Sequence, residues 1–437
     1  MKDLTEGNIM PILLRFAVPI IFSRVFQLFY SVADTRIVGE ALGDSALAAI
    51  GASSTFYQFL LTFITGLTSG FAIVVARHYG SKNEDLFHHA VAGTFCLGSV
   101  ISIVLTLGSL LTVPAMLRIL NIQTDLLFES GLYLKIVLCG MLLSALYNLC
   151  AGVLYGVGDS VTPLIFLIIS TLSNIGLDIL FVMVLPFGVA GAAWATIVAQ
   201  GFAAFSCFSY MLKKYPVLRV HRNDFHLERE MTEDLLKTGI SCGLMQSMIS
   251  LGSLTLQITI NGLGEVYIVA QTAARRISEI LMMPFLAMGS AVGTFISQNL
   301  GANKPERVKK GYRDSIFMLW IWCAAVLVIA YSFSPLLVQL ITATESEEII
   351  HAATTYLHVD TVFYFMLPLI LVSRQTLQAL GDQIMPVISS GIECVGKMII
   401  AFTLAKAIGY WGIILAEPIV WFIMVIPLMM GIKKRMP

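Results

Sequence analysis

The chain has 437 residues, of which 57% are hydrophobic and only 12% are charged, and its mean hydropathy is +0.84. Soluble domains carry about 25% charged residues, so this composition excludes an ordinary soluble protein and indicates an integral membrane protein. The formal net charge is zero, which gives no reason to expect nucleic acid as a partner, because nucleic-acid binding proteins need basic surfaces.

Apolar runs of transmembrane length follow one another along the whole chain, and each span needs about 20 residues. The predicted fold class is therefore all-α integral membrane. We predict twelve transmembrane helices, at 11–38, 45–76, 89–113, 127–154, 161–185, 189–212, 235–262, 267–299, 314–340, 350–379, 386–407 and 411–432.

Basic residues indicate the orientation. They gather in the linker at 213–237, in the loop after the eighth span and at the C-terminus. The loops near Asp159, Glu265, Glu345 and Asp382 carry none. By the positive-inside rule, we expect the linker and both termini in the cytoplasm and the protein in the plasma membrane, surrounded by lipid.

The second half of the chain repeats landmarks of the first half. The landmarks, each followed by its second-half equivalent in parentheses, are Gly43 (Gly264), Gly80 (Gly301), Asp159 (Asp382), Pro163 (Pro386), Gly188 (Gly409), Gly191 (Gly412) and Ala195 (Ala416). The offset in numbering is 223 for the aspartate and the proline and 221 for the others. Such a near-constant offset indicates two copies of one unit.

The duplication predicts the domain organisation. We predict an N-terminal six-helix lobe at 1–212, a linker at 213–234 and a C-terminal six-helix lobe at 235–437. Six spans per copy is an even number, so both copies enter the membrane from the same side. We therefore expect a pseudo-two-fold axis along the membrane normal.

The first span carries a polar stripe at helical spacing, formed by Ser23, Gln27, Tyr30 and Asp34. Ionisable groups are costly in hydrocarbon and usually face a cavity or a partner. Pro19 lies in the same span and removes a backbone hydrogen bond, which permits a kink. An alternative for Asp34 is a helix-end position at the membrane interface, because Thr35 and Arg36 follow it.

The fifth span carries Thr171, Asn174 and Asp178 on one helical face. If Asp34 and Asp178 lie on facing helices, their carboxylates and the nearby amide and hydroxyl oxygens suit a proton or a sodium ion. An alternative for Asp178 is a structural hydrogen bond between helices.

Charges within the later spans have several interpretations. Arg275 and Glu279, like Glu393 and Lys397, are spaced for intrahelical ion pairs. Asp360, Arg374 and Glu417 have no obvious partner in the sequence. The histidines show no metal-ligand spacing, so we predict no metal site and no cofactor apart from the coupling ion.

Two short patterns have structural interpretations. Gly239 to Gly243 fits a serine-hydrolase pattern, but that motif needs a strand before its turn, and here it opens a transmembrane helix. Nothing in the sequence resembles a phosphate-binding loop, so we do not expect ATP-driven transport. Because no catalytic cluster is readable, we do not expect an enzyme. The spacings Gly66/Gly70 and Gly239/Gly243 are typical of close helix packing. We expect packing within each bundle rather than a dimer face, and a monomer.

Several motifs in order resemble the multidrug and toxic compound extrusion (MATE) transporters. They are Val18-Pro19-Ile20, Leu28-Phe29-Tyr30-Ser31-Val32-Ala33-Asp34, Leu47-Ala48-Ala49-Ile50, Gly156-Val157-Gly158-Asp159, Asn174-Ile175-Gly176-Leu177-Asp178 and Gln298-Asn299-Leu300-Gly301-Ala302. They extend over most of the chain.

This resemblance implies two six-helix lobes around a central cavity, and export of small amphipathic, mostly cationic compounds in exchange for protons or sodium ions. It places a cation site at Asp34, Asn174 and Asp178, with Thr196 and Asn148 as further ligands. Some members use a glutamate on the seventh helix, but here the seventh span has no acid. Asp360 is the remaining C-lobe candidate, and Glu279 and Arg276 are secondary ones.

Three alternatives need weighing, and only the first stays open. A lipid-linked oligosaccharide flippase would share the two-lobe plan, and Arg24, Arg275, Arg276 and Arg374 are compatible with it. A channel would need a repeated filter motif and a membrane enzyme a polar catalytic cluster, and the sequence shows neither. By the repeat offset, Asp34 and Asp178 correspond to Thr255 or Leu256 and to Ile399 or Ile400, so we predict that cation chemistry is confined to the first copy.

Overall fold

The computed structural model describes the chain except for residues 1–2, 120–125, 186, 227 and 437. The described chain is nearly all helical, and twelve of its helical stretches are long and apolar enough to cross a membrane. The predicted fold class and the predicted number of spans are confirmed.

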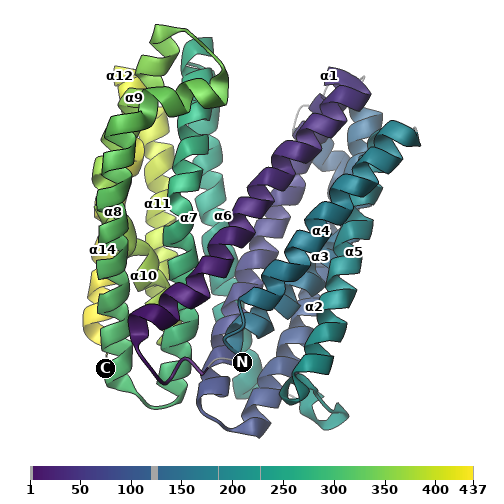
Figure 1. The fold of residues 1–437 in the computed structure, drawn as a ribbon, viewed down its shortest axis with the longest axis vertical. Helices are drawn as coiled ribbons and strands as arrows, with labels where there is room; N and C mark the ends of the chain where they lie inside the picture. The colour runs from purple at the N-terminus through teal and green to yellow at the C-terminus, as the bar shows by residue number, and fades with distance from the viewer. Residues whose placement is uncertain (1–2, 120–125, 186, 227, 437) are drawn as a thin grey trace. The chain divides into compact units, whose positions relative to one another are not determined.

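The helices of the first half and the linker appear in chain order in Figure 1. They are α1 (Ile9–Gly80), α2 (Glu84–Ile119), α3 (Leu127–Gly156), α4 (Val161–Asp178), the π-helix η2 (Ile179–Val184), α5 (Gly188–Lys214), η3 (Pro216–Leu218) and η4 (Arg222–Phe225).

The second half of the chain begins with α6, whose first residues belong to the predicted linker. Its helices are α6 (Arg229–Asn261), α7 (Glu265–Gly301), α8 (Pro305–Thr342), α9 (Glu347–Val362), η5 (Phe363–Phe365), α10 (Met366–Ala379), α11 (Ile384–Phe402), α12 (Leu404–Ile408), α13 (Tyr410–Ile414) and α14 (Ala416–Arg435).

Glycines with left-handed backbone occupy equivalent places in both copies, which gives the sequence repeat a structural basis. Gly43 (φ 80°) separates the first two spans within α1, and Gly264 (φ 109°) precedes α7. Gly158 and Gly381 share φ values of 81° and 82°, and Gly188 and Gly409 share 60° and 61°. Other residues are strained at such dihedrals, so these glycines mark the turns of each copy.

The change of offset from 223 to 221 has a local cause. The first copy is longer than the second by two positions between the repeated proline, Pro163 or Pro386, and the repeated glycine, Gly188 or Gly409. The π-helix η2, which begins directly after Asp178, lies within that stretch, and π-helical turns accommodate inserted residues. The offset of 223 therefore holds along α4, and Asp178 corresponds to Ala401, not to Ile399 or Ile400.

Contacts divide the chain into two compact units that do not follow the predicted lobe boundaries. Unit 1 comprises Met1–Asp3 and Pro19–Gly243, and unit 2 comprises Leu4–Val18 and Leu244–Pro437. The start of the chain thus belongs with the second copy, and the start of the second copy belongs with the first.

Hydrogen bonds explain why the start of the chain joins unit 2. The Leu4 backbone N–H donates to Gln298 (3.1 Å), and the Leu4 carbonyl accepts from Asn299 (3.2 Å). Lys304 donates to the Thr5 carbonyl (2.9 Å), and Leu4 and Thr5 are buried. Hydropathy alone does not report such partners.

Close backbone packing explains why the first turns of α6 join unit 1. A Cβ added to Gly66 would lie 2.6 Å from the Cys242 carbonyl oxygen, and one added to Gly70 would lie 2.6 Å from that of Thr238. The two glycine pairs predicted to pack closely therefore pack against each other, between α1 and α6 of unit 1. One pair comes from each predicted lobe, so the expectation of packing within each predicted six-helix bundle is wrong.

The loops at Asp159 and Asp382 cap helices in the same way in both copies. Asp159 Oδ1 accepts from the N–H groups of Val161 and Thr162 (both 3.0 Å), and Asp382 Oδ1 accepts from those of Ile384 (3.1 Å) and Met385 (3.2 Å). These bonds satisfy the free amides at the starts of α4 and α11.

The second carboxylate oxygen of each loop aspartate corrects the topology inferred from the lack of basic residues. Asp159 Oδ2 accepts from Tyr215 at the start of the linker, and Asp382 Oδ2 lies 3.6 Å from Arg435 at the end of α14. These loops therefore lie at the same end of their units as the linker and the C-terminus.

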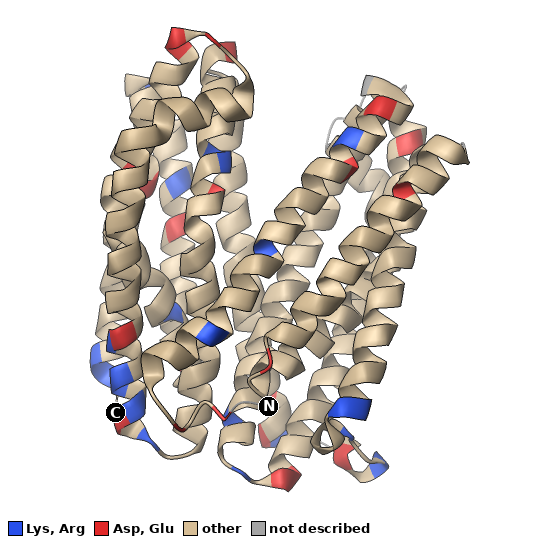
Figure 2. Cartoon of the chain, viewed as in Figure 1, with Lys and Arg blue, Asp and Glu red and all other residues tan. Residues whose placement is uncertain are grey.

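Charged residues concentrate at the helix ends within each unit, as Figure 2 shows. In unit 1, basic residues gather where α5 meets the linker, and in unit 2 where α14 ends. Some of the few charges within the helices, among them Glu393 and Lys397 of α11, form the sites described next.

Candidate functional site

Within the polar stripe on α1, Tyr30 and Asp34 are half-buried and Gln27 is exposed. Ser23 is buried and donates to the Pro19 carbonyl (3.0 Å). The acceptor is the carbonyl oxygen of the proline itself. The backbone dihedrals of α1 are non-helical at Gly43 and remain helical at Pro19, and the boundary between the two units falls between Val18 and Pro19.

Asp34 of α1 and Asp178 of α4 interact with each other through their carboxyl groups. Asp178 is fully buried, and its Oδ1 has no hydrogen-bond donor among the described groups. Two carboxylate oxygens cannot bond unless a proton or a cation lies between them, so this pair is a place where a proton or a small cation can bind.

Asn174 and Thr196 complete the cluster from α4 and α5. In the orientation that satisfies both ends of its amide, Asn174 donates to Asp178 Oδ2 (2.8 Å) and accepts from the Thr196 N–H (3.1 Å). The Thr196 hydroxyl donates to the Ala192 carbonyl (3.1 Å), so its oxygen can accept from Tyr30 of the α1 stripe. Asp34, Asp178, Asn174, Thr196 and Tyr30 form one connected polar cluster, which we call the N-terminal cluster.

Arg36 and Asn148 both have hydrogen-bond partners outside the N-terminal cluster. Arg36 pairs with Glu40 (2.7 Å) at the exposed surface, so the basic residue near Asp34 has another partner. Asn148 donates to the Ser144 carbonyl of its own helix (2.8 Å). Its amide is thus engaged outside the connected cluster.

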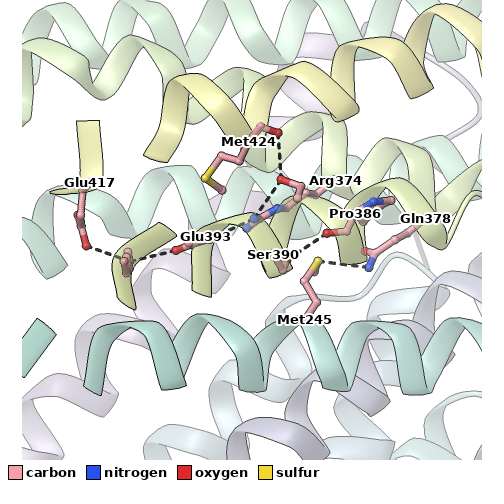
Figure 3. A network of polar contacts seen from close by, with 10 residues as sticks. Met245, Arg374, Gln378, Pro386, Ser390, Glu393, Glu417 and Met424 are labelled. Carbon is pink, nitrogen blue, oxygen red and sulfur yellow. Dashed lines mark hydrogen bonds and ion pairs between the residues drawn. The ribbon is translucent and has the colours of Figure 1, made fainter. Parts of the chain in front are cut away.

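A second buried polar group lies in unit 2, and Figure 3 shows it from close by. Arg374 of α10 donates to Glu393 Oε2 of α11 (3.1 Å). Lys397, one turn along α11, bridges Glu393 Oε1 (3.1 Å) and Glu417 Oε1 of α14 (3.1 Å). We call these four residues the C-terminal network.

The contacts of the C-terminal network bear on several sequence expectations. The intrahelical pair of Glu393 with Lys397 is confirmed. Arg374 and Glu417, which lacked a partner in the sequence, both join it. The offset of 223 was the signal that could have located Lys397, because it aligns this residue with Asn174.

The secondary candidates of the second copy separate into two groups. Asp360 of α9 is buried next to Tyr364 and interacts electrostatically with Glu417, Lys397 and Arg275. Glu279 instead pairs with Arg276 (3.6 Å), and both side chains are about half exposed. The expected pairing of Glu279 with Arg275 is therefore wrong, because the two arginines face different sides of α7.

Neither site resembles a transition-metal centre. Among the residues that the structure describes, no group of three or more histidine, cysteine, aspartate or glutamate side chains could hold a metal ion. The oxygen-rich N-terminal cluster has the donor chemistry for a proton or a small hard cation.

Comparison with known proteins places these observations in a family. The MatE family model matches residues 19–180 and again 242–403. "Probable multidrug resistance protein YoeA" of Bacillus subtilis (strain 168) is 27% identical over 414 residues, covering 91% of this chain and 88% of the relative. The "FAD transporter" of Shewanella oneidensis is 26% identical over 351 residues, covering 77% of this chain and 76% of the relative.

Solved structures agree in fold. The structure "Outward-facing conformation of a multidrug resistance MATE family transporter of the MOP superfamily" has a TM-score of 0.90 at 22% identity, covering 99% of this chain and 97% of that one. "Crystal structure of MATE in the bent conformation" has a TM-score of 0.91 at 22% identity, covering 99% and 96%. The two matched segments, the twelve spans and these likenesses lead to one conclusion: the chain is a multi-pass membrane protein that belongs to the MATE family of multidrug efflux transporters.

Proposed function

We propose that this protein exports small amphipathic, mostly cationic compounds in exchange for a proton or a sodium ion bound in the N-terminal cluster. The observation that carries the proposal is the close pair of Asp34 and Asp178 carboxyl groups. Among the ion pairs of the described residues, none includes either acid. A single monovalent cation or proton would relieve the repulsion between them.

The cycle follows from that charge balance. In the outward-open state, the cation binds between Asp34 and Asp178 and neutralises the counter-charge that holds a cationic substrate. The substrate leaves, the first helix rearranges about Pro19, the lobes rock, and the cation is released to the cytoplasm. In this scheme the protein acts as a monomer in the plasma membrane, with both termini and the linker cytoplasmic.

Dye transport in proteoliposomes, with pH and sodium gradients imposed separately, tests the coupling. Asp34→Asn and Asp178→Asn should each abolish gradient-driven efflux while the protein stays folded. Glu40→Gln is the matched control, because Glu40 lies on the same helix but pairs at the surface with Arg36. Wild-type efflux from either aspartate variant contradicts the proposal.

The range of substrates needs its own assay, since one relative is named a FAD transporter. A panel with a cationic dye, a neutral compound and an anionic dinucleotide should show gradient-driven transport of the cationic dye above the other two. A preference for the anionic dinucleotide, or for a lipid-linked substrate, would contradict the proposed substrate class. It would not bear on the ion site, which the aspartate variants test separately.

A further inference from the structure

The second copy contains positions equivalent to the N-terminal cluster. Because the offset of 223 holds along α4 up to the π-helix, Asn174 corresponds to Lys397 of α11. Gly191 and Gly412 share the offset of 221, so Thr196 corresponds to Glu417 of α14. Both assignments come from the landmarks that flank each residue.

The equivalent residues are also partners in both units. In unit 1, the Asn174 amide accepts from the Thr196 N–H at 3.1 Å. In unit 2, the Lys397 ammonium contacts Glu417 Oε1 at 3.1 Å. The second copy therefore keeps the same pairing between its fifth and sixth helices, but with an ammonium and a carboxylate in place of an amide and a hydroxyl residue.

The seventh span makes room for this lysine. A Cβ added to Gly252 of α6 would lie 3.2 Å from Lys397 Cδ and 3.2 Å from the Cys394 Cα. By the offset of 221, Gly252 corresponds to Ser31, which lies one helical turn before Asp34 in the first copy. One turn before the position equivalent to Asp34, α6 thus has a glycine, and the stem of Lys397 packs against it.

The N-terminal cluster and the C-terminal network differ in what lies next to their buried acids. The Lys397 side chain is 3% exposed and lies between two acids, Glu393 and Glu417. Asp360, 1% exposed, adds a third carboxyl group, and its Oδ1 has no hydrogen-bond partner among the described residues. Among the ion pairs of the described residues, none joins a basic side chain to the acids of the N-terminal cluster, whereas the acids of unit 2 have an ammonium tethered between them.

We propose that the Lys397 ammonium is a built-in substitute for the coupling cation, and that it occupies a latent site for one small monovalent cation in unit 2. The proposal rests on the proposed function in taking the N-terminal cluster as the coupling site. Removal of the lysine charge should open the latent site to sodium or to a proton, which carboxylate oxygens both accept.

The test uses the full chain, purified, with Asp34→Asn and Asp178→Asn in the background so that the N-terminal cluster does not contribute. Sodium binding is measured by equilibrium dialysis at alkaline pH with choline as the replacement ion. Lys397→Met should bind about one more sodium ion per protein than Lys397→Arg. Its Tm should also rise with sodium but not with choline.

A second arm distinguishes the proton from sodium. In sodium-free buffer, the Tm of Lys397→Met should rise as the pH is lowered if a proton fills the site, whereas that of Lys397→Arg should not. Lys397→Gln, which keeps a hydrogen-bond donor between the acids, is a second variant in case Lys397→Met does not fold, and it should give the same result.

The overturning result is the absence of any sodium- or proton-dependent gain in the Lys397→Met and Lys397→Gln variants, which would make Lys397 an ordinary structural ion pair. Lys397→Met with Glu417→Gln should lose the gain, and an undiminished gain there would also overturn the proposal. These measurements need no transport, so a failed ion-coupling proposal, seen as efflux by the aspartate variants, is distinguishable from a failed latent site.

Discussion

The N-terminal cluster and the C-terminal network occupy equivalent places in the two copies but solve the problem of buried charge differently. In unit 1, Asp34 and Asp178 lie together with an amide and hydroxyl groups. In unit 2, Glu393 and Glu417 are bridged by Lys397 and supported by Arg374. A buried acid with a tethered partner is structural, whereas one without a partner can exchange a mobile cation.

The largest effect on transport should come from placing a lysine, the cation of the second copy, at the equivalent position of the first copy. Asn174→Lys would put an ammonium next to Asp178 and Asp34, as Lys397 lies next to its two acids. We expect gradient-driven dye efflux in proteoliposomes to fall by about tenfold or more, because a charged hydrogen bond contributes about 1.5–3 kcal/mol. Asn174→Gln is the control and should keep most activity. Efflux by Asn174→Lys close to wild type would show that no exchangeable cation binds there.

Removing one acid from each place should change stability in opposite directions. Glu393→Gln leaves Arg374 and Lys397 buried with one acid fewer, and breaking a buried pair costs about 3–5 kcal/mol. Asp178→Asn removes one of two like charges and should leave stability unchanged or raise it. Thermal unfolding of the purified variants in detergent measures both. Equal destabilisation by the two substitutions would remove the distinction between the sites.

The helix contacts of the two copies differ in a way that a smaller change can test. Gly70 packs against the backbone at Thr238, and its equivalent in the second copy is Ala291, which is fully buried. Gly70→Ala should therefore lower the free energy of unfolding by about 1–3 kcal/mol through overpacking. Gly176→Ala, whose Cβ would meet nothing within 4 Å, is the matched control and should be neutral or slightly stabilising. A neutral Gly70→Ala would show that α6 can move away from α1 without cost.

The smallest effect concerns the capping aspartate of the first copy. Burial alone would raise the pKa of Asp159, but hydrogen bonds from Thr162 and Tyr215 outweigh it and hold the pKa below its ordinary value. A lowered pKa means that the stabilisation is complete above the unfolded pKa, about 3.9, and is lost as pH falls through the folded value.

Asp159→Asn should accordingly lower the free energy of unfolding by about 1 kcal/mol at neutral pH. The difference from wild type should shrink as the pH falls below about 3.9 and should close below the folded pKa of Asp159. Thermal unfolding at neutral and at acid pH measures it, and Asp382→Asn allows comparison with the second copy. A difference that persists at acid pH would mean that the amide disturbs the loop by its shape rather than its charge.

Much of the fold and part of the site could be predicted from the sequence. The stripe with Asp34 and the face with Asp178 were visible because helical periodicity is a local property. Their approach to each other is long-range, and here it agrees with the prediction. The partners of Arg374 and Glu417 were not visible, because they lie on other helices, several turns away along the chain.

The boundaries of the two units were also not predictable from local sequence patterns. Spans and linker were read from hydropathy and charge, which report how each segment meets lipid or water. Which unit a segment joins depends on hydrogen bonds such as that between Leu4 and Gln298, and on the close contact of Gly66 with Cys242. Neither contact can be recognised from the local pattern of hydropathy and charge.

By itself, the sequence determined the membrane class, the twelve spans, the duplication and the polar faces of α1 and α4. Hydropathy, repeat offset and periodicity depend only on the order of residues along the chain. Only the tertiary structure decided which charges meet. The rotation and packing of the helices bring Asp34 to Asp178 without a cation and place Lys397 between Glu393 and Glu417. In a low-dielectric interior, that choice of neighbour decides what a buried charge can do.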